Sequence, residues 1–246
     1  MRALLRLTSA ETTMFLREPL SVIFAVALPP VLLIVFGVIP SFNEPDPDLG
    51  GVRIIDLYLP IIIAMAIAMV ALANLPQHLA TYREKGVLRR MRTTPITPTV
   101  LLGAHLLMCV LVTAITSLAV LTLGALAFDV ALPQNLLGYL LAFALTALAT
   151  LSVGLLAASW APGGTSASAI GLVSLFPLLF FAGLWVPRVS MSEVLRTISD
   201  LTPLGAGVQA LDDAAAGGWP QLVHLAVLVA WTIVAGGLAA RTFRWE

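Results

Sequence analysis

The chain has few charged residues and a single cysteine. Only 11% of its 246 residues are charged and 59% are hydrophobic, whereas a soluble domain of this size carries about 25% charged residues. This composition indicates a polytopic membrane protein. The lone Cys109 excludes an intrachain disulfide framework. The formal net charge of +0 offers no basic surplus, and we expect no nucleic-acid partner.

Motifs for nucleotide hydrolysis and for common hydrolases are also missing. The sequence contains no Gly-x-x-x-x-Gly-Lys-Ser/Thr, no His-Glu-x-x-His and no Gly-x-Ser-x-Gly. Gly163-Gly164-Thr165 is followed by no lysine and predicts a turn. We therefore expect a chain that is no enzyme by itself, with no metal or cofactor of its own.

Long apolar runs are what the chain does have. A helix needs about 20 apolar residues to cross about 30 Å of hydrocarbon. Strand-like alternation is missing, which argues against a β-barrel. We predict an all-α fold, one transmembrane domain over 1–246, with six spans near 20–40, 57–77, 100–125, 136–158, 166–186 and 219–240.

Positive charges distinguish the two sides of these six spans. Lysine and arginine gather in cytoplasmic loops. With the N-terminus in the cytoplasm, the outer loops hold Arg53, Arg188 and Arg196. The inner segments hold Arg2, Arg6, Arg17, Arg83, Lys85, Arg89, Arg90, Arg92, Arg241 and Arg244. We therefore predict that both termini are cytoplasmic.

The segments outside the spans suggest further elements. Residues 1–19 resemble an amphipathic interfacial helix, residues 41–56 an irregular acidic loop, and residues 159–165 a tight inner turn. In residues 187–218 we predict two short helices that dip into the outer leaflet, the second beginning at Val208. Met191, Val194, Leu195 and Ile198 would form the apolar face of the first. A plain surface helix is the alternative. Residues 241–246 form a basic cytoplasmic tail.

The spans lack the groups that couple transport to an ion gradient. Ionisable residues inside a membrane are costly and usually functional, yet the span cores contain no Asp, Glu, Lys or Arg. His78, His105 and His224 fall near span ends, where interfacial or packing roles are favoured. Asn74 and Gln77 could bond between helices. Energy for any transport must then enter through a contact with another protein.

Residues 81–92 form a dense basic island, and residues 79–92 predict a helix. Pro95 ends it, because a residue before proline disfavours the helical region. Such a helix could transmit a conformational change from a soluble partner to the spans. It could equally be an anchor that contacts lipid phosphates, and spacing alone does not separate these two readings.

The island also carries a family resemblance. Residues 83–88, Arg-Glu-Lys-Gly-Val-Leu, with the later Met91, Thr94-Pro95 and Leu101-Leu102-Gly103, resemble the coupling-helix region of type-2 ABC exporter permeases of the daunorubicin-resistance kind. Residues 16–19, 181–187 and 201–204, with the basic tail at Thr242-Phe243-Arg244, resemble other parts of that family in order and spacing. Val87 and Arg89 depart from its pattern.

The resemblance implies a transport subunit that works with a separate ATPase. Two six-span subunits, identical or paralogous, would pair with two ATPase copies, which bind the ATP and Mg. The coupling residues would be Tyr82, Arg83, Glu84, Lys85, Gly86, Arg89, Arg90 and Arg92. Spans 2 and 5 would line a cleft with Met65, Met69, Phe176 and Phe180, although each of these could instead pack in the bundle or face lipid. Small residues at the start of span 5 would allow close helix approach, at a subunit interface in one reading.

We therefore expect a permease in a bacterial inner membrane that exports drugs, lipids or glycolipids, with multidrug efflux and antibiotic resistance as possible roles. A non-transporting membrane scaffold, an ion-coupled carrier and an intramembrane enzyme are the alternatives. Replacing Arg89, Arg90 and Arg92 by Glu is expected to weaken ATPase association without preventing membrane insertion.

Overall fold

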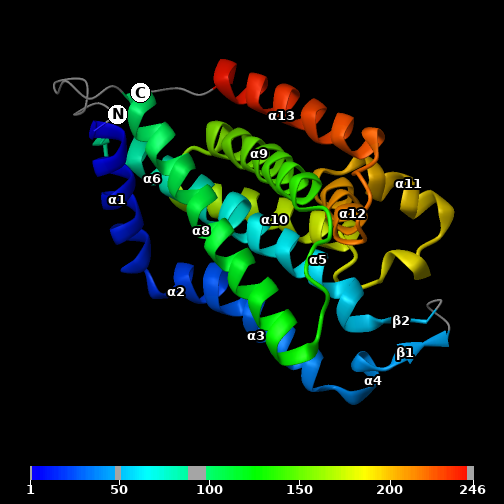
Figure 1. Ribbon diagram of the computed structural model, residues 1–246. Helices are drawn as coiled ribbons and strands as arrows, with labels where there is room; N and C mark the ends of the chain where they lie inside the picture. The colour runs from blue at the N-terminus through cyan, green and yellow to red at the C-terminus, as the bar shows by residue number, and fades with distance from the viewer. Residues whose placement is uncertain (1, 48–50, 88–97, 243–246) are drawn as a thin grey trace.

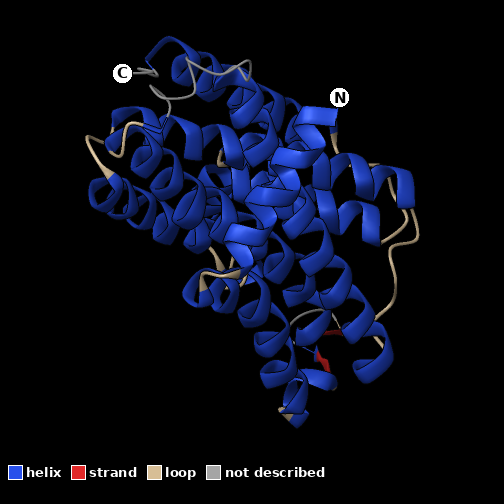
Figure 2. Cartoon of the chain, turned by 90° about the vertical axis from the view of Figure 1, so that its left-hand side faces the viewer, coloured by secondary structure: helices blue, strands red, loops and turns tan. Residues whose placement is uncertain are grey.

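The computed structural model describes residues 2–47, 51–87 and 98–242, and this part of the chain is almost entirely helical (Figures 1 and 2). The first helix, α1 (Arg2–Leu16), precedes a broken span made of α2 (Pro19–Val22), η1 (Ile23–Ala27) and α3 (Leu28–Val38). The second span is likewise composite, with α5 (Ile54–Ala68), η3 (Met69–Asn74) and α6 (Leu75–Glu84). The other four spans are unbroken helices: α8 (Pro98–Phe128), α9 (Leu136–Trp160), α10 (Gly164–Phe181) and, after two shorter helices, α13 (Leu222–Thr242).

Within the described residues, six helices are long and apolar enough to cross a membrane. They are Pro19–Val38, Ile54–Glu84, Thr99–Phe128, Leu136–Trp160, Gly164–Phe181 and Leu222–Thr242, referred to below as spans 1 to 6. The predicted all-α fold class with six spans is confirmed.

The two ends of the bundle carry different elements. An even number of spans places the start of span 1 and the end of span 6 at the same end of the bundle. We call this the terminal end: it holds α1, the end of α6, the start of α8 and the end of α13. The far end holds α4 (Pro40–Asn43), strands β1 (Pro45–Asp46) and β2 (Val52–Arg53), α11 (Glu193–Leu201) and α12 (Pro203–Ala215).

Span 2 forms the centre of the bundle. In its most apolar stretch 78% of the residues are buried, compared with 22% in spans 1 and 6 and 28% in span 5. Its residues from Ile62 to Ala68 are essentially inaccessible. A helix that is apolar on all sides suits such a position. The exposed apolar surface of the outer spans suits contact with lipid.

Glycines let two other spans approach span 2 closely. A Cβ on Gly154 of α9 would lie 1.9 Å from the carbonyl oxygen of Ala71, and a Cβ on Gly171 of α10 would lie 1.9 Å from that of Leu72. Small residues at such contacts are typical of membrane bundles. The small residues of span 5 therefore serve packing inside this chain, against span 2.

Prolines explain the irregular turns in spans 1 and 2. A proline has no N–H for the carbonyl four residues earlier. Pro29 and Pro30 come after η1, and Pro76 comes after η3. The backbone in η1 and η3 adopts π-helical turns before those prolines. Such turns occur frequently at functional sites, and η1 and η3 contact each other.

The helix predicted over residues 79–92 is interrupted. Span 2 continues without a break through α6 and ends at Glu84, with Lys85 as its C-cap. Gly86 then adopts a positive φ of 64°, a left-handed conformation that costs other residue types free energy. The basic island is therefore partly the last turn of a span, and its residues 88–92 lie outside the described part of the chain.

The predicted irregular loop at 41–56 is wrong in part. The short helix α4 begins at Pro40, and β1 pairs antiparallel with β2, with Pro45 opposite Arg53. Arg53 also bonds the Asp56 carboxylate at 2.8 Å and the Phe128 carbonyl at 3.1 Å. The hydrogen bond from Arg53 to Asp56 raises the pKa of Arg53. These bonds hold the β1–β2 hairpin against the start of span 2 and the end of span 3.

The two helices predicted within residues 187–218 are present with different boundaries. The second, α12, begins at Pro203 rather than Val208, because Thr202 caps it by accepting from the Gly205 N–H. Most of α12 is buried against spans 2, 4 and 6. Of the apolar face predicted for the first helix, α11, Val194 is 69% exposed and Ile198 is 40% exposed, whereas Leu195 is half-buried and Met191, which precedes α11, is 3% exposed.

Span 5 ends five residues earlier than predicted. Its helix ends at Phe181, and Gly183 has a φ of 97°. The Gly183 N–H bonds the Phe180 carbonyl and the Leu184 N–H bonds the Leu179 carbonyl. A glycine in this conformation is the usual way to end a helix.

Candidate functional site: the end of span 2 and the adjoining groove

The last turn of α6 holds the described members of the predicted coupling set. Tyr82, Arg83 and Glu84 belong to α6, while Lys85 and Gly86 form the turn directly after it. Arg89, Arg90 and Arg92 lie outside the described residues. Tyr82 is buried with 8% exposure, and Glu84 and Lys85 are exposed.

Tyr82 connects span 2 to the N-terminal helix through a buried acid. Its hydroxyl donates to both carboxylate oxygens of Glu11 on α1, each at 3.0 Å. The Glu11 Oε2 atom also lies 2.7 Å from Nδ1 of His105 on α8. Glu11 is 5% exposed and His105 is 0% exposed. Three helices that are distant in sequence thus meet at one carboxylate.

Burying a carboxylate costs several kcal/mol unless hydrogen bonds and charge partners replace water. Both oxygens of Glu11 have such partners in this cluster. Loss of any one partner would leave a buried polar group unsatisfied. The arrangement therefore holds α1 in one place against α6 and α8.

A second set of bonds lies beside the first. Oε2 of Glu18 lies 3.0 Å from Nε2 of His78, and it also accepts from the Ser21 hydroxyl at 3.0 Å. The Ser21 oxygen accepts from Nδ2 of Asn74 at 3.0 Å. The His78 and His105 rings are 5.5 Å apart. His78, His105 and Asn74 therefore bond between helices, whereas Gln77 is exposed.

The same turn of α6 also contacts the chain between spans 4 and 5. Arg83 donates to the carbonyl oxygen of Ala161. Oε2 of Glu84 accepts from the Gly164 N–H at 3.0 Å. Gly163, the N-cap of α10, has no side chain to satisfy the helix N-terminus. Glu84 supplies that cap from another span, where its negative charge also suits the helix dipole.

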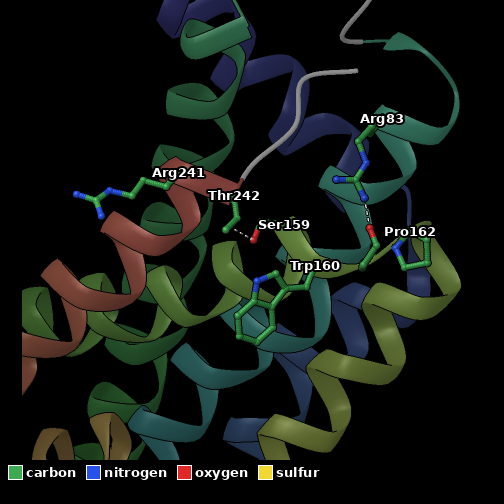
Figure 3. Close-up of a pocket in the computed structure, with 7 residues that line it drawn as sticks. Arg83, Ser159, Trp160, Pro162, Arg241 and Thr242 are labelled. Carbon is green, nitrogen blue, oxygen red and sulfur yellow. Dashed lines mark hydrogen bonds between the residues drawn. The ribbon is translucent and has the colours of Figure 1, made fainter.

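A cavity of about 620 Å³ lies at the terminal end, bounded by Arg83, the 159–162 segment, Arg241 and Thr242. Figure 3 shows Arg83 directed toward the chain beside Pro162, while Arg241 extends to the opposite side. The Ser159 and Thr242 hydroxyls lie 2.8 Å apart between them. The cavity thus brings together the ends of spans 2, 4 and 6.

A groove of about 470 Å³ runs between spans 1, 2 and 5. We call it the inter-span groove. Two residues of the predicted cleft, Met69 and Phe176, line it. Met65 does not line it, because it lies in the core with 1% exposure. Phe180 is half-buried beside Phe181 and is also outside the lining.

Sequence reasoning misses the central residue of this site. Within the predicted interfacial helix Glu11 is one polar residue among several, yet it lies on the same face as Leu4, Leu7, Thr8 and Phe15. These residues have the three- and four-residue spacing of one helix face. An acidic residue in the middle of an apolar face is therefore the available signal. Its partners Tyr82 and His105, 71 and 94 residues further along the chain, are not predictable.

The fold and this geometry define a multi-pass helical membrane protein whose helix ends meet at one side of the bundle. The model of the ABC-2 type transporter family matches residues 2–214. The chain therefore belongs to the ABC-2 type transporter family, as a membrane permease domain without ATPase activity of its own. A comparison with curated proteins gives no match.

Proposed function

We propose that this chain is the transmembrane subunit of an ATP-driven exporter of hydrophobic or amphipathic molecules. Permeases of this family generally work with an ABC ATPase. Two permease subunits, identical or paralogous, would then assemble with two ATPase copies that bind ATP and Mg. Drugs, lipids and glycolipids are the candidate substrates, and multidrug efflux with antibiotic resistance is the candidate physiological role.

One observation carries the coupling part of the proposal. The last turn of α6 bonds α1 through Tyr82 and the start of span 5 through Glu84. Spans 1, 2 and 5 also form the walls of the inter-span groove. A force applied at residues 82–84 would therefore act directly on spans 2 and 5, and on span 1 through α1, which precedes it. Tyr82, Arg83, Glu84, Lys85, Gly86, Arg89, Arg90 and Arg92 are the residues that we propose for ATPase coupling.

The lining of the groove supports an apolar or amphipathic substrate. Met69 and Phe176 present polarisable, adaptable surface, and the Phe176 ring stacks on Trp185 with 6.0 Å between centroids. The excess of lysine and arginine at the terminal end supports a cytoplasmic orientation of that end. The bacterial inner membrane is the proposed location.

The buried pair of Glu11 and His105 is an observation that favours an ion-coupled carrier, because ionisable groups in a membrane mark proton pathways. Glu11, however, belongs to α1, which precedes the first span. Its partners lie at the terminal ends of spans 2 and 3. A structural tie between helices accounts for the same contacts, and the exporter remains the proposal.

The test is reconstitution with the ATPase encoded beside this gene. We expect the two proteins to co-purify, and amphiphiles to stimulate ATP hydrolysis by the complex in lipid nanodiscs. Movement of a fluorescent lipid across liposomes should require ATP. Uphill accumulation by the purified permease alone, driven by an ion gradient, would contradict the proposal. A scaffold would give neither ATP-dependent movement nor stimulated hydrolysis.

A further inference from the structure

The inter-span groove has a polar end and an apolar end. Ser21 on span 1, Asn74 and Gln77 on span 2, and Ser168 on span 5 lie toward the terminal end. Apolar side chains, among them Phe24, Met69, Phe176 and Leu179, line the rest. From Ser168 to Leu179 the helix rises roughly 16 Å, about half the thickness of a hydrocarbon core. The groove therefore matches the depth of one leaflet.

Charge is missing from this lining. None of the described residues that line the groove is ionisable. Glu18, which bonds Ser21 of the lining, is itself outside the lining and also bonds His78. An ionic headgroup in this groove would meet no counter-charge and would lose its hydration. The polar end is suited to hydrogen bonding with an uncharged group.

Asn74 supplies an unused acceptor at that polar end. It is 6% exposed, and its Oδ1 atom is buried without a hydrogen-bond partner in the described structure. The Ser21 hydroxyl donates to Glu18, so its oxygen accepts from Asn74, which directs the amide nitrogen to Ser21. Buried polar atoms are nearly always paired in proteins, and an exception requires an explanation.

The backbone around Asn74 supports the same conclusion. Asn74 is the last residue of the π-helical segment η3, and the π-helical η1 of span 1 supplies Phe24 and Ala25 to the groove. Widened turns of this kind occur frequently at functional sites. Two of them in the lining of one groove indicate a site built to hold a ligand.

We propose that the inter-span groove binds an amphiphile whose headgroup is uncharged and rich in hydrogen-bond donors, with the headgroup at Asn74 and the tail along Met69 and Phe176. The inference rests on the proposed exporter function and narrows its substrate class. A sugar or amide headgroup provides donors for Asn74 Oδ1. Under the proposed orientation, the headgroup is taken from the cytoplasmic leaflet.

The test compares three probes that share one dodecyl chain: dodecyl maltoside, dodecyl phosphate and dodecyltrimethylammonium. Each is added below its micellar concentration to the permease–ATPase complex in nanodiscs, and ATP hydrolysis is measured. We expect the maltoside to act at a half-maximal concentration about tenfold lower than either charged probe, since a site lacking a counter-charge disfavours ions.

Asn74→Leu should raise the half-maximal concentration of the maltoside about tenfold, because a site built to hydrogen-bond a hydroxyl discriminates through that bond. Ser168→Ala should raise it less, and it tests the same end of the groove if Asn74→Leu fails to fold. Ser174→Ala is the matched control, because Ser174 is also on α10 but does not line the groove. It should leave the response unchanged.

Equal or stronger stimulation by a charged probe would overturn the headgroup inference while leaving the exporter function intact. If no probe changes ATP hydrolysis, both proposals fail. If Asn74→Leu and Ser168→Ala alter association between permease copies and leave the maltoside response unchanged, the groove is a subunit contact and the inference is wrong.

Discussion

Glu11 connects three helices at the terminal end of the bundle. It is the point where α1, α6 and α8 meet, through the Tyr82 hydroxyl and the His105 ring. A water-exposed carboxylate on an interfacial helix would leave α1 free to slide along the membrane surface. A buried carboxylate with two partners gives α1 a defined position instead.

We expect Glu11→Gln to reduce the free energy of unfolding by about 2 kcal/mol, because hydrogen bonds to a charged group contribute roughly 1.5–3 kcal/mol. Reversible thermal unfolding in detergent would measure this change. Glu18→Gln is the control, since the side chain of Glu18 is 46% exposed and its bonds are screened by water. Equal effects of the two substitutions would show that the buried cluster does not stabilise the fold.

Gly171 is a second residue at which the structure leaves no room for a side chain. Gly171→Ala would place a methyl group 1.9 Å from the Leu72 carbonyl oxygen, so that span 5 must move away from span 2. Overpacking of this kind costs about 1–3 kcal/mol. Gly237→Ala on α13 is the matched control, because a Cβ there meets no atom within 4 Å. A thermal-shift measurement that ranks the two substitutions equally would contradict this packing.

At the scale of elements, the last turn of α6 connects two parts of the molecule that are far apart in the sequence. Tyr82 leads to α1, while Arg83 and Glu84 lead to the start of α10. The left-handed conformation of Gly86 marks the end of this turn. This turn can transmit a movement to α1 and to α10 only if its hydrogen bonds to both helices are intact.

Replacing Glu84 by Ala tests whether the bond between α6 and α10 transmits this movement. Since Glu84 caps α10 from another span, its loss should destabilise the first turn of α10 by about 1 kcal/mol. In the ATPase complex we expect amphiphile-stimulated hydrolysis to fall several-fold, while complex assembly is retained.

Glu193→Ala is the control for that experiment, because Glu193, like Glu84, is an exposed acid beside a helix N-terminus, but it lies in the first turn of α11 at the far end. Hydrolysis that responds equally to both changes would place the coupling elsewhere, for example in α1.

At the scale of the whole molecule, orientation in the membrane depends on charge and is open to direct measurement. Cys109 is fully buried, so the unmodified chain should give no background with a membrane-impermeant maleimide. Lys85→Cys places a thiol at an exposed site of the terminal end, and Glu44→Cys places one at the far end.

In intact cells, we expect labelling of Glu44→Cys and no labelling of Lys85→Cys until the membrane is permeabilised, since positive loops face the cytoplasm. The reverse pattern would invert the proposed orientation, and with it the assignment of the groove to the cytoplasmic leaflet.

The sequence predicted the spans well and their ends less well. Apolar length alone located all six, because about 20 residues are needed to cross a bilayer. It did not locate the end of span 2 at Glu84 or the start of α12 at Pro203. Those boundaries depend on the left-handed conformation of Gly86 and on the N-cap Thr202. Neither feature changes the hydropathy profile appreciably.

Only two of the four residues predicted to line a cleft lie together in the structure. Met69 and Phe176 line the inter-span groove, whereas Met65 is buried four residues away on the same span. Span 2 is apolar on all sides, so its sequence holds no periodicity that distinguishes a groove-facing side from a core-facing one.

Composition, apolar length and the distribution of arginine were enough to predict a six-span membrane protein, since these properties reflect each segment's own free energy in lipid and water. The permease class depended on the family motifs and on the family match over residues 2–214. Which side chains meet depended on packing. Glu11 bonds Tyr82 and His105 because α1 packs against α8, and Glu84 bonds the start of α10 because the glycines of α10 allow this helix to lie close to span 2. Contacts between residues many positions apart are set by the whole bundle, and no local stretch of sequence encodes them.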